Sequence, residues 1–170
     1  LGLLHCSVSD LKKIHGIGTV KAVQLKCIGE LSKRIASTAA RISLDFNSPD
    51  SIAAYYMEDM RYYRQEHLKL LMLNTRSRLI GESEISRGTV NMSVISPREL
   101  FIEALQKNAV YIILLHNHPS GDPMPSREDI LVTQRIREGG SLLGIELLDH
   151  IIIGDNCYVS LAEQKLLKEK

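Results

Sequence analysis

The hydrophobic and polar positions of this chain repeat with more than one period, and each period predicts a different element. Residues 8–35 follow a helical period that breaks at the sequence HGIG, residues 15–18. After the break, apolar side chains recur at roughly helical spacing at Val20, Val23, Leu25, Cys27, Ile28, Leu31 and Ile35. We therefore expect two helices joined by a glycine-containing turn in the N-terminal part.

Residues 36–49 have no clear period and end in turn-forming residues. This change of pattern predicts a linker and a domain boundary. We accordingly expect a small helical hairpin segment over residues 1–40 and a larger domain over residues 41–170.

From residue 48 onward, helical and extended patterns alternate. Ser48 and Ser96 are each followed by proline, which is typical of a helix start, and Ser96 and Glu99 have the spacing of a capping box. We expect helices over 48–64, from 96 onward, over 127–138 and from a cap at Ser160–Glu163, and strands over 67–74, 79–86, 110–116, 144–154 and 157–160. This mixture predicts a layered domain of the α/β (α+β) class.

The composition is that of a globular protein: 170 residues, of which 44% are hydrophobic, suffice for a core. No apolar run approaches the roughly 20 residues that cross a bilayer, and the first ten residues lack the pattern of a signal peptide. We therefore expect no membrane contact and a cytoplasmic location. Cys6, Cys27 and Cys157 are widely spaced and form no CxxC pair, so we expect them to be small buried hydrophobes.

The net charge of +1 is divided unevenly along the chain. Residues 1–41 contain seven Lys or Arg and two acidic residues, a balance of +5, which leaves −4 for residues 42–170. Such a division permits a polyanionic partner at the N-terminal end only, although a basic helix face is more often simply a solvated surface.

The stretch HNHPSGDPMPSRED, residues 116–129, directly follows the apolar run VYIILL. Alternate side chains of a strand share a face, so His116 and His118 point the same way and Asn117 points away. Ser126 stands where a helix should begin, and Asp129 would face back from its first turn. Two imidazoles and one carboxylate can hold a catalytic zinc that keeps a fourth position for water.

A simpler interpretation of the same stretch is also open. Ser126 and Asp129 have the spacing of an ordinary capping arrangement, which needs no metal. A single histidine within an apolar strand, such as His150, is more often a core residue, and we assign it at most a role in supporting the ligands. The combination of paired histidines, a proline-stiffened loop and an inward carboxylate favours metal binding. The same ligands also suit manganese or iron.

The residues His116, His118, Ser126 and Asp129 match the pattern His-x-His, seven residues, Ser, two residues, Asp, of JAMM (MPN-type) metallopeptidases. RGTVNMSVISPREL at 87–100, the full HNHPSGDPMPSRED stretch and LDHIIIG at 148–154 resemble the bacterial RadC family. The segment LKKIHGIGTVKAVQL at 11–25 is similar to the helix-hairpin-helix that precedes the JAMM domain in that family.

The resemblance implies a curved β-sheet flanked by helices, a layered architecture like that of cytidine deaminases, with one Zn²⁺ at the end of the histidine strand. It also implies an upstream glutamate as general base, and Glu66 occupies that place; Glu58, Glu82 and Glu99 are weaker candidates. Ser126 would then stabilise the oxyanion as a metal-activated water hydrolyses an amide or isopeptide bond. The protein or peptide substrate stays open.

The N-terminal hairpin supports an alternative of a different class. In helix-hairpin-helix modules the backbone amides of the glycine turn hold a nucleic-acid phosphate, and Gly16, Gly18 and Lys21 occupy the corresponding positions. A structural turn in a small bundle explains the same residues. The family name also brings an association with DNA repair, so the second hypothesis is a DNA-associated accessory protein whose metal site is structural or vestigial.

Overall fold

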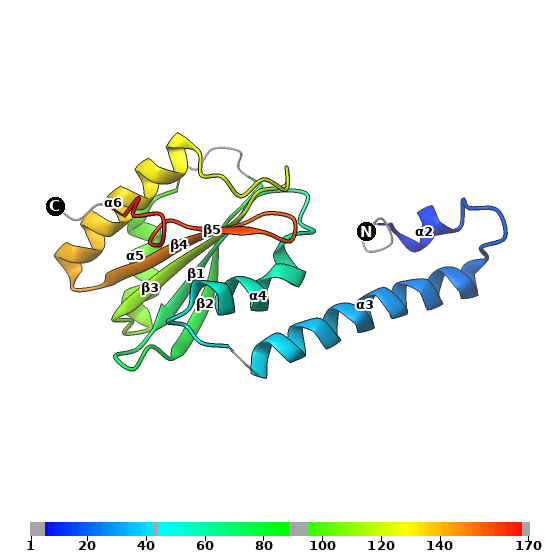
Figure 1. The fold of residues 1–170 in the computed structure, drawn as a ribbon, viewed down its shortest axis with the longest axis horizontal. Coiled ribbons are helices and arrows are strands. Elements are labelled where there is room, and N and C mark those ends of the chain that lie inside the picture. The colour runs from blue at the N-terminus through cyan, green and yellow to red at the C-terminus, as the bar shows by residue number, and fades with distance from the viewer. Residues whose placement is uncertain (1–5, 43, 89–94, 168–170) are drawn as a thin grey trace. The chain divides into compact units, whose positions relative to one another are not determined.

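The computed structural model describes residues 6–42, 44–88 and 95–167 (Figure 1). The chain forms two compact units, Leu1–Leu44 and Asp45–Lys170. Among the described residues, no helix combines the length and the apolar character that a membrane span requires. Part of the RGTVNMSVISPREL stretch, residues 89–94, lies outside the described residues.

The described residues of the first unit form one capped helical turn and one long helix. In α2 (Val8–Leu11), the Ser7 hydroxyl accepts the Asp10 amide at 3.1 Å, and the Asp10 carboxylate accepts the Ser7 amide at 3.2 Å. α3 spans Thr19–Ile42, so the prediction of a linker beginning at residue 36 is wrong. The reason is local: residues 36–42 contain three alanines and no glycine or proline, so nothing in that stretch ends the helix.

The cysteines are not core residues, contrary to the sequence prediction. Cys27 and Cys157 are exposed and Cys6 is partly buried. Cys27 lies on α3 among apolar side chains such as Leu31, which is 59% exposed. Within the described part of the first unit, only Leu11 and Ala22 are buried apolar side chains, because a single turn of helix covers little of α3.

The second unit alternates helices and strands as the sequence predicts, with boundaries that differ by a few residues. Its elements are α4 (Pro49–Met60), β1 (His67–Leu73), β2 (Leu79–Arg87), α5 (Pro97–Gln106), β3 (Tyr111–Asn117), α6 (Arg127–Leu143), β4 (Glu146–Ile153) and β5 (Tyr158–Ser160).

The five strands form one mixed sheet in the order β2-β1-β3-β4-β5. β3 and β4 are parallel and are joined through α6, and the other three neighbouring pairs are antiparallel. The predicted α/β (α+β) class is confirmed, and a mixed sheet with flanking helices is consistent with the JAMM/MPN fold. In this topology the end of β3 and the start of α6 are connected by one loop, which places residues 116–129 beyond the end of the central strand.

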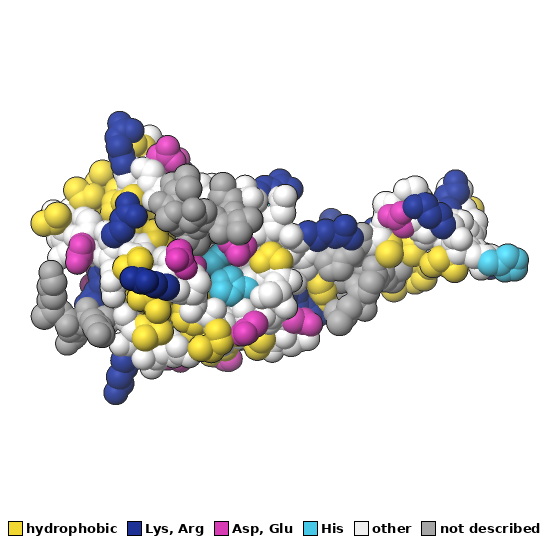
Figure 2. Space-filling view, turned by 90° about the horizontal axis from the view of Figure 1, so that it is seen from above, with side chains coloured by type: hydrophobic (Ala, Val, Ile, Leu, Met, Phe, Trp, Pro, Cys, Tyr) yellow, Lys and Arg dark blue, Asp and Glu magenta, His cyan; other side chains and the backbone are white. Residues whose placement is uncertain are grey.

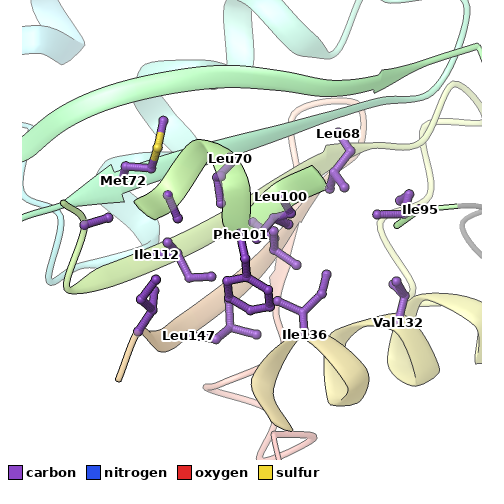
Figure 3. Close-up of a cluster of buried hydrophobic side chains, with 14 residues drawn as sticks. Leu68, Leu70, Met72, Ile95, Leu100, Phe101, Ile112, Val132, Ile136 and Leu147 are labelled. Atoms are coloured by element: carbon purple, nitrogen blue, oxygen red, sulfur yellow. The ribbon is translucent and has the colours of Figure 1, made fainter. Parts of the chain in front are cut away.

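Helices cover both faces of the sheet (Figure 1). On one face, alternate residues of β1 and β3 such as Leu70 and Leu114 pack with Phe101 of α5 and Ile136 of α6 (Figure 3). On the other face, the Tyr56 hydroxyl of α4 donates to Glu82 of β2 at 2.7 Å. Burial of both faces explains why β1 and β3 are continuous apolar runs rather than alternating ones.

Two predicted helix details are wrong. Ser96 is the N-cap of α5 and Pro97 follows it, but the Ser96 side chain makes no capping hydrogen bond. Residues 161–165 form turns instead of a helix. The Ser160 hydroxyl does accept the Glu163 amide at 3.0 Å, but Lys165 has a φ of 56°, in the left-handed region, and this ends the helical path after one turn.

Candidate metal centre

The end of β3 carries both histidines of the HNH triplet. His116 is 1% exposed, faces α6 and lies with its ring 4.7 Å from the ring of His118. The Nδ1 of His118 lies 2.8 Å from the carbonyl oxygen of Asp122. A carbonyl only accepts hydrogen bonds, so Nδ1 carries the hydrogen and Nε2 keeps a lone pair for a ligand. A loop carbonyl thus sets the orientation that a metal-binding imidazole requires.

Asp129 faces the two imidazoles from the first turn of α6. Its Oδ1 lies 3.5 Å from Nδ1 of His116, and its Oδ2 lies 3.5 Å from Nε2 of His118. Ligands held at 2.0–2.1 Å around a tetrahedral ion lie about 3.3 Å from one another. The separation of the Asp129 oxygens from the imidazoles therefore suits a shared cation.

Glu66 approaches the same histidines from the segment that enters β1. Its Oε2 lies 3.7 Å from Nε2 of His116, and its side chain is 28% exposed. Ligand atoms of Glu66, His116 and His118 all lie within 4.8 Å of one another, so this cluster could hold a metal ion. The family resemblance implied Glu66 as a general base, and this cluster makes it a candidate ligand as well.

Asn117 holds the Glu66 segment in place, a role that the sequence analysis missed. Its Oδ1 accepts the backbone amide of His67 at 2.8 Å, and its Nδ2 donates to the carbonyl of Gln65 at 3.1 Å. The side chain is 1% exposed. A buried amide in an otherwise apolar strand was the available signal, because such a group must find hydrogen-bond partners. Asn117 therefore holds the backbone on either side of Glu66, whose carboxylate the two histidines face.

Several buried atoms of the site have no hydrogen-bond partner among the described residues. They are Nδ1 and Nε2 of His116 and Oδ1 of Asp129. An unpaired buried polar atom is destabilising by about 1–3 kcal/mol, so such atoms are rare unless a ligand satisfies them. Nδ1 of His116 and Oδ1 of Asp129 face each other at 3.5 Å, on residue types that bind metals, so a divalent cation could satisfy both.

The electrostatic environment of Asp129 favours its ionised form, which is the form that binds a metal. Burial opposes its ionisation, but the interactions with His118, the His116 charge and the Ser126 hydrogen bonds outweigh burial and hold the pKa of this carboxyl below its usual range. The Asp129 interaction in turn raises the pKa of His118 above its ordinary value, against the effect of burial. A cation between them would replace the proton as the partner of both groups.

Ser126 caps α6, as the simpler interpretation of its spacing predicted. Its hydroxyl donates to Oδ2 of Asp129 at 2.7 Å and accepts the Asp129 amide at 3.1 Å, and its own amide donates to the same Oδ2 at 2.7 Å. The serine therefore orients the Asp129 carboxylate. The hydroxyl hydrogen is committed to Asp129 in this arrangement, so oxyanion stabilisation by Ser126 would require the hydroxyl to turn.

The weaker glutamate candidates have other partners or other places. Glu58 pairs with Arg61 at 2.9 Å, and Glu82 accepts from Tyr56 and from Lys69, the latter at 2.6 Å. Glu99 belongs to the first turn of α5 and lines a separate pocket with residues of β2. Of the four glutamates considered as general base, Glu66 is the one that the fold places beside His116.

The centre opens into a cleft of about 640 Å³. Its lining residues are Arg64, Gln65, Glu66, Gly88, His118, Pro119, Ser120, Ser126, Glu128 and Asp129. Figure 2 shows histidine side chains reaching the surface of the second unit with acidic side chains beside them. A substrate in this cleft would meet His118, Asp129 and Glu66, whereas His116 lies buried behind them.

The loop that follows the histidines is held by the β4–β5 turn. The carbonyl of Gly121 accepts the Asp155 amide at 2.9 Å, and the His118 amide donates to the Ile153 carbonyl at 2.9 Å. A Cβ on Gly154 would lie 2.3 Å from the Gly121 carbonyl oxygen, so only glycine permits this approach. The loop that carries the Asp122 carbonyl is thus fixed to the sheet.

Comparison with known proteins assigns the family. The model of the RadC-like JAB domain matches residues 46–166. The chain belongs to this family. UPF0758 proteins of Desulfitobacterium hafniense and Clostridium acetobutylicum are 49% and 48% identical to it over 166 residues, which cover 98% of this chain and 73% and 72% of the relatives. A UPF0758 protein of Clostridium botulinum is 49% identical over 162 residues, 95% of this chain and 71% of the relative.

The matched region of the RadC-like JAB domain contains Glu66, both histidines of the triplet, Ser126 and Asp129. It begins two residues after the first compact unit ends at Leu44, so the family model covers the sheet and its helices and not α3. The resemblance that the sequence motifs predicted is therefore confirmed for the domain that carries the candidate centre.

Proposed function

We propose that the second unit is a zinc-dependent hydrolase of peptide or isopeptide bonds. The observation that supports it most directly is the set of unpaired, buried ligand atoms on His116 and Asp129, behind the cleft that His118 and Asp129 line. His116, His118 and Asp129 would hold the ion. This set of two imidazoles and one carboxylate is a common one for catalytic zinc and leaves a position for solvent.

The chain's own groups have distinct tasks in this proposal. Zinc, when bound, would lower the pKa of a coordinated water from 15.7 to about 7 and polarise the carbonyl of the substrate. Glu66 accepts the proton of the attacking water, because its carboxylate reaches both the cleft and His116. It then delivers that proton to the leaving nitrogen. Ser126 keeps Asp129 oriented and, when its hydroxyl turns, donates to the oxyanion.

Metal removal tests this function. We expect wild-type protein to bind one zinc per chain, to lose hydrolysis of a broad panel of peptide and isopeptide substrates after chelation, and to regain it with zinc. Metal content is measured on the same samples as turnover. Stoichiometric zinc without any turnover across the panel would contradict the enzyme proposal and favour a structural or vestigial metal site in a DNA-associated accessory protein.

For the first unit we propose weak, sequence-independent DNA contact, with any part in DNA repair following from it. Gly16 and Gly18 are exposed in the turn before the 24-residue helix α3, Gly16 has a φ of 83°, and Lys21 lies in the first turn, where its Nζ donates to the Gly16 carbonyl at 3.1 Å. A helix start with an adjacent cation suits a phosphate. The balance of +5 over residues 1–41 adds a general attraction.

The salt dependence of binding tests the DNA proposal. We expect the affinity for short duplex DNA to fall as salt rises from low to physiological concentration, because bound cations are released from DNA on binding. Lys21→Glu should weaken binding further, and Lys107→Glu, the same charge change at an exposed lysine of the second unit, serves as the matched control. Affinity measured by fluorescence anisotropy that changes with neither salt nor Lys21→Glu would contradict phosphate contact.

A further inference from the structure

A buried chain of hydrogen bonds runs from β4 to the turn of α6 that carries Asp129. The Thr133 hydroxyl donates to the backbone carbonyl of Asp129 at 2.5 Å, and the same oxygen lies 2.6 Å from Nδ1 of His150. Thr133 is 1% exposed and His150 is fully buried. The chain therefore connects the centre of β4 to the backbone of a candidate ligand.

The chemistry of the three groups fixes where the hydrogens lie. A carbonyl only accepts, so the single hydroxyl hydrogen of Thr133 points to Asp129. Nδ1 of His150 must then donate to the Thr133 oxygen, which leaves a lone pair on Nε2.

His150 also supports the other side of the centre. Its ring stacks on the ring of His116 at a centroid distance of 5.8 Å and an interplanar angle of 30°. Leu114, two residues before His116 in β3, is the register partner of His150 across the parallel pair. One residue of β4 thus contacts the His116 imidazole directly and the Asp129 backbone through Thr133.

The usual local roles of these residues do not account for this arrangement. A threonine within a helix often bonds to the carbonyl four residues back without any further partner. Here its oxygen also takes a hydrogen bond from a histidine of another element, and both side chains are buried. Burying a threonine and a histidine is unfavourable unless their hydrogen bonds are made, and valine would fill the threonine site equally well.

We propose that Thr133 and His150 are positioning residues that hold Asp129 and His116 at the separation a metal ion needs. The inference rests on the proposed function, because it assumes that these two side chains bind zinc. It assigns no contact with substrate to either residue. Their effect is on metal affinity first and on turnover only as a consequence, since groups behind metal ligands usually change affinity by about 10- to 100-fold.

The test compares Thr133→Val, which removes the hydroxyl at nearly constant shape, with Thr133→Ser, which keeps it. We expect Thr133→Val to weaken zinc binding by about 10-fold or more and Thr133→Ser to stay within about 3-fold of wild type. His150→Phe keeps a ring beside His116 and removes the donor, and it should weaken binding to a similar degree. Zinc affinity is measured by competition with a chromophoric chelator, and the ligand field by the visible spectrum of the cobalt-loaded protein.

A double variant shows whether Thr133 and His150 act through one chain of hydrogen bonds or whether each substitution causes its own packing defect. If Thr133 and His150 act through one chain, Thr133→Val with His150→Phe should bind zinc about as weakly as the weaker single variant. Thermal unfolding of each metal-free variant shows whether the fold is retained. If Thr133→Val or His150→Phe unfolds the protein, Thr133→Ser still tests the proposal. This variant keeps the hydroxyl, so a loss of zinc affinity in it would contradict the proposal.

The outcomes distinguish this inference from the proposed function. Thr133→Val that folds and binds zinc as tightly as wild type, with an unchanged cobalt spectrum, overturns the inference alone. The inference is also overturned if the losses of zinc affinity caused by Thr133→Val and His150→Phe add in the double variant. A wild type that binds zinc but cleaves nothing overturns the hydrolase proposal and leaves the positioning role intact, and a wild type that binds no zinc overturns both.

Discussion

Glu66→Gln is expected to reduce hydrolysis by about 10²- to 10⁴-fold, the usual contribution of a general base. The amide has nearly the shape of the carboxylate and fits the same segment between Gln65 and His67, so the fold should not change. It cannot accept the proton of the attacking water. Zinc content should be retained, because His116, His118 and Asp129 remain.

The control for this substitution is Glu128→Gln. Glu128 is an exposed glutamate that lines the same cleft. Steady-state turnover and metal content are measured for both variants and for wild type. If Glu66→Gln loses the metal together with the activity, Glu66 is a ligand of the Glu66, His116 and His118 cluster and not the base.

Asp129→Asn is expected to abolish tight zinc binding, with a loss of affinity of more than about 100-fold, a larger effect than for a group behind a ligand. The change removes the anionic oxygen between the two imidazoles and keeps an amide oxygen that can still accept from Ser126. Zinc at one hundred times the wild-type dissociation constant should stabilise wild type by about 2.7 kcal/mol and this variant by less than about 0.4 kcal/mol.

The matched control is Asp122→Asn in the loop before α6. The Asp122 side chain accepts the Met124 amide at 3.0 Å, which asparagine can also do, and it is the backbone carbonyl of Asp122 that orients His118. Thermal unfolding with and without zinc is the measurement for both variants. A zinc-dependent stabilisation of Asp129→Asn equal to that of wild type would remove Asp129 from the ligand set.

The two substitutions probe opposite sides of one arrangement. Glu66 arrives from the segment before β1 and is fastened by Asn117, whereas Asp129 arrives from α6 and is fastened by Ser126 and Thr133. Between them stands the end of β3, whose histidines are separated by the residue that holds Glu66. Each candidate functional side chain therefore has a neighbour that fixes it, as a preorganised site requires.

Local signals in the sequence were sufficient for most elements of the second unit, though not for residues 161–165, and for the two histidines and the aspartate of its centre. The helix starts at Ser48 and Ser126 depend on hydrogen bonds within four residues, so their chemistry can be predicted without the fold. The spacing of His116 and His118 on a strand fixes their common face by backbone geometry alone. The same is not true of helix ends: α3 continued past residue 35 because no local residue stopped it.

What the sequence determined by itself is the order of strands and helices, the paired imidazoles and the capped carboxylate at Asp129, because these follow from periods and short spacings. Only the tertiary structure decided that Glu66 stands beside His116, that Asn117 and Thr133 support the ligands, and that His150 lies behind the centre. Except for the bond from Thr133 to the Asp129 carbonyl four residues earlier, those contacts join residues 17 to 52 positions apart in the chain. Their geometry depends on the pairing of β1, β3 and β4, which no local pattern specifies.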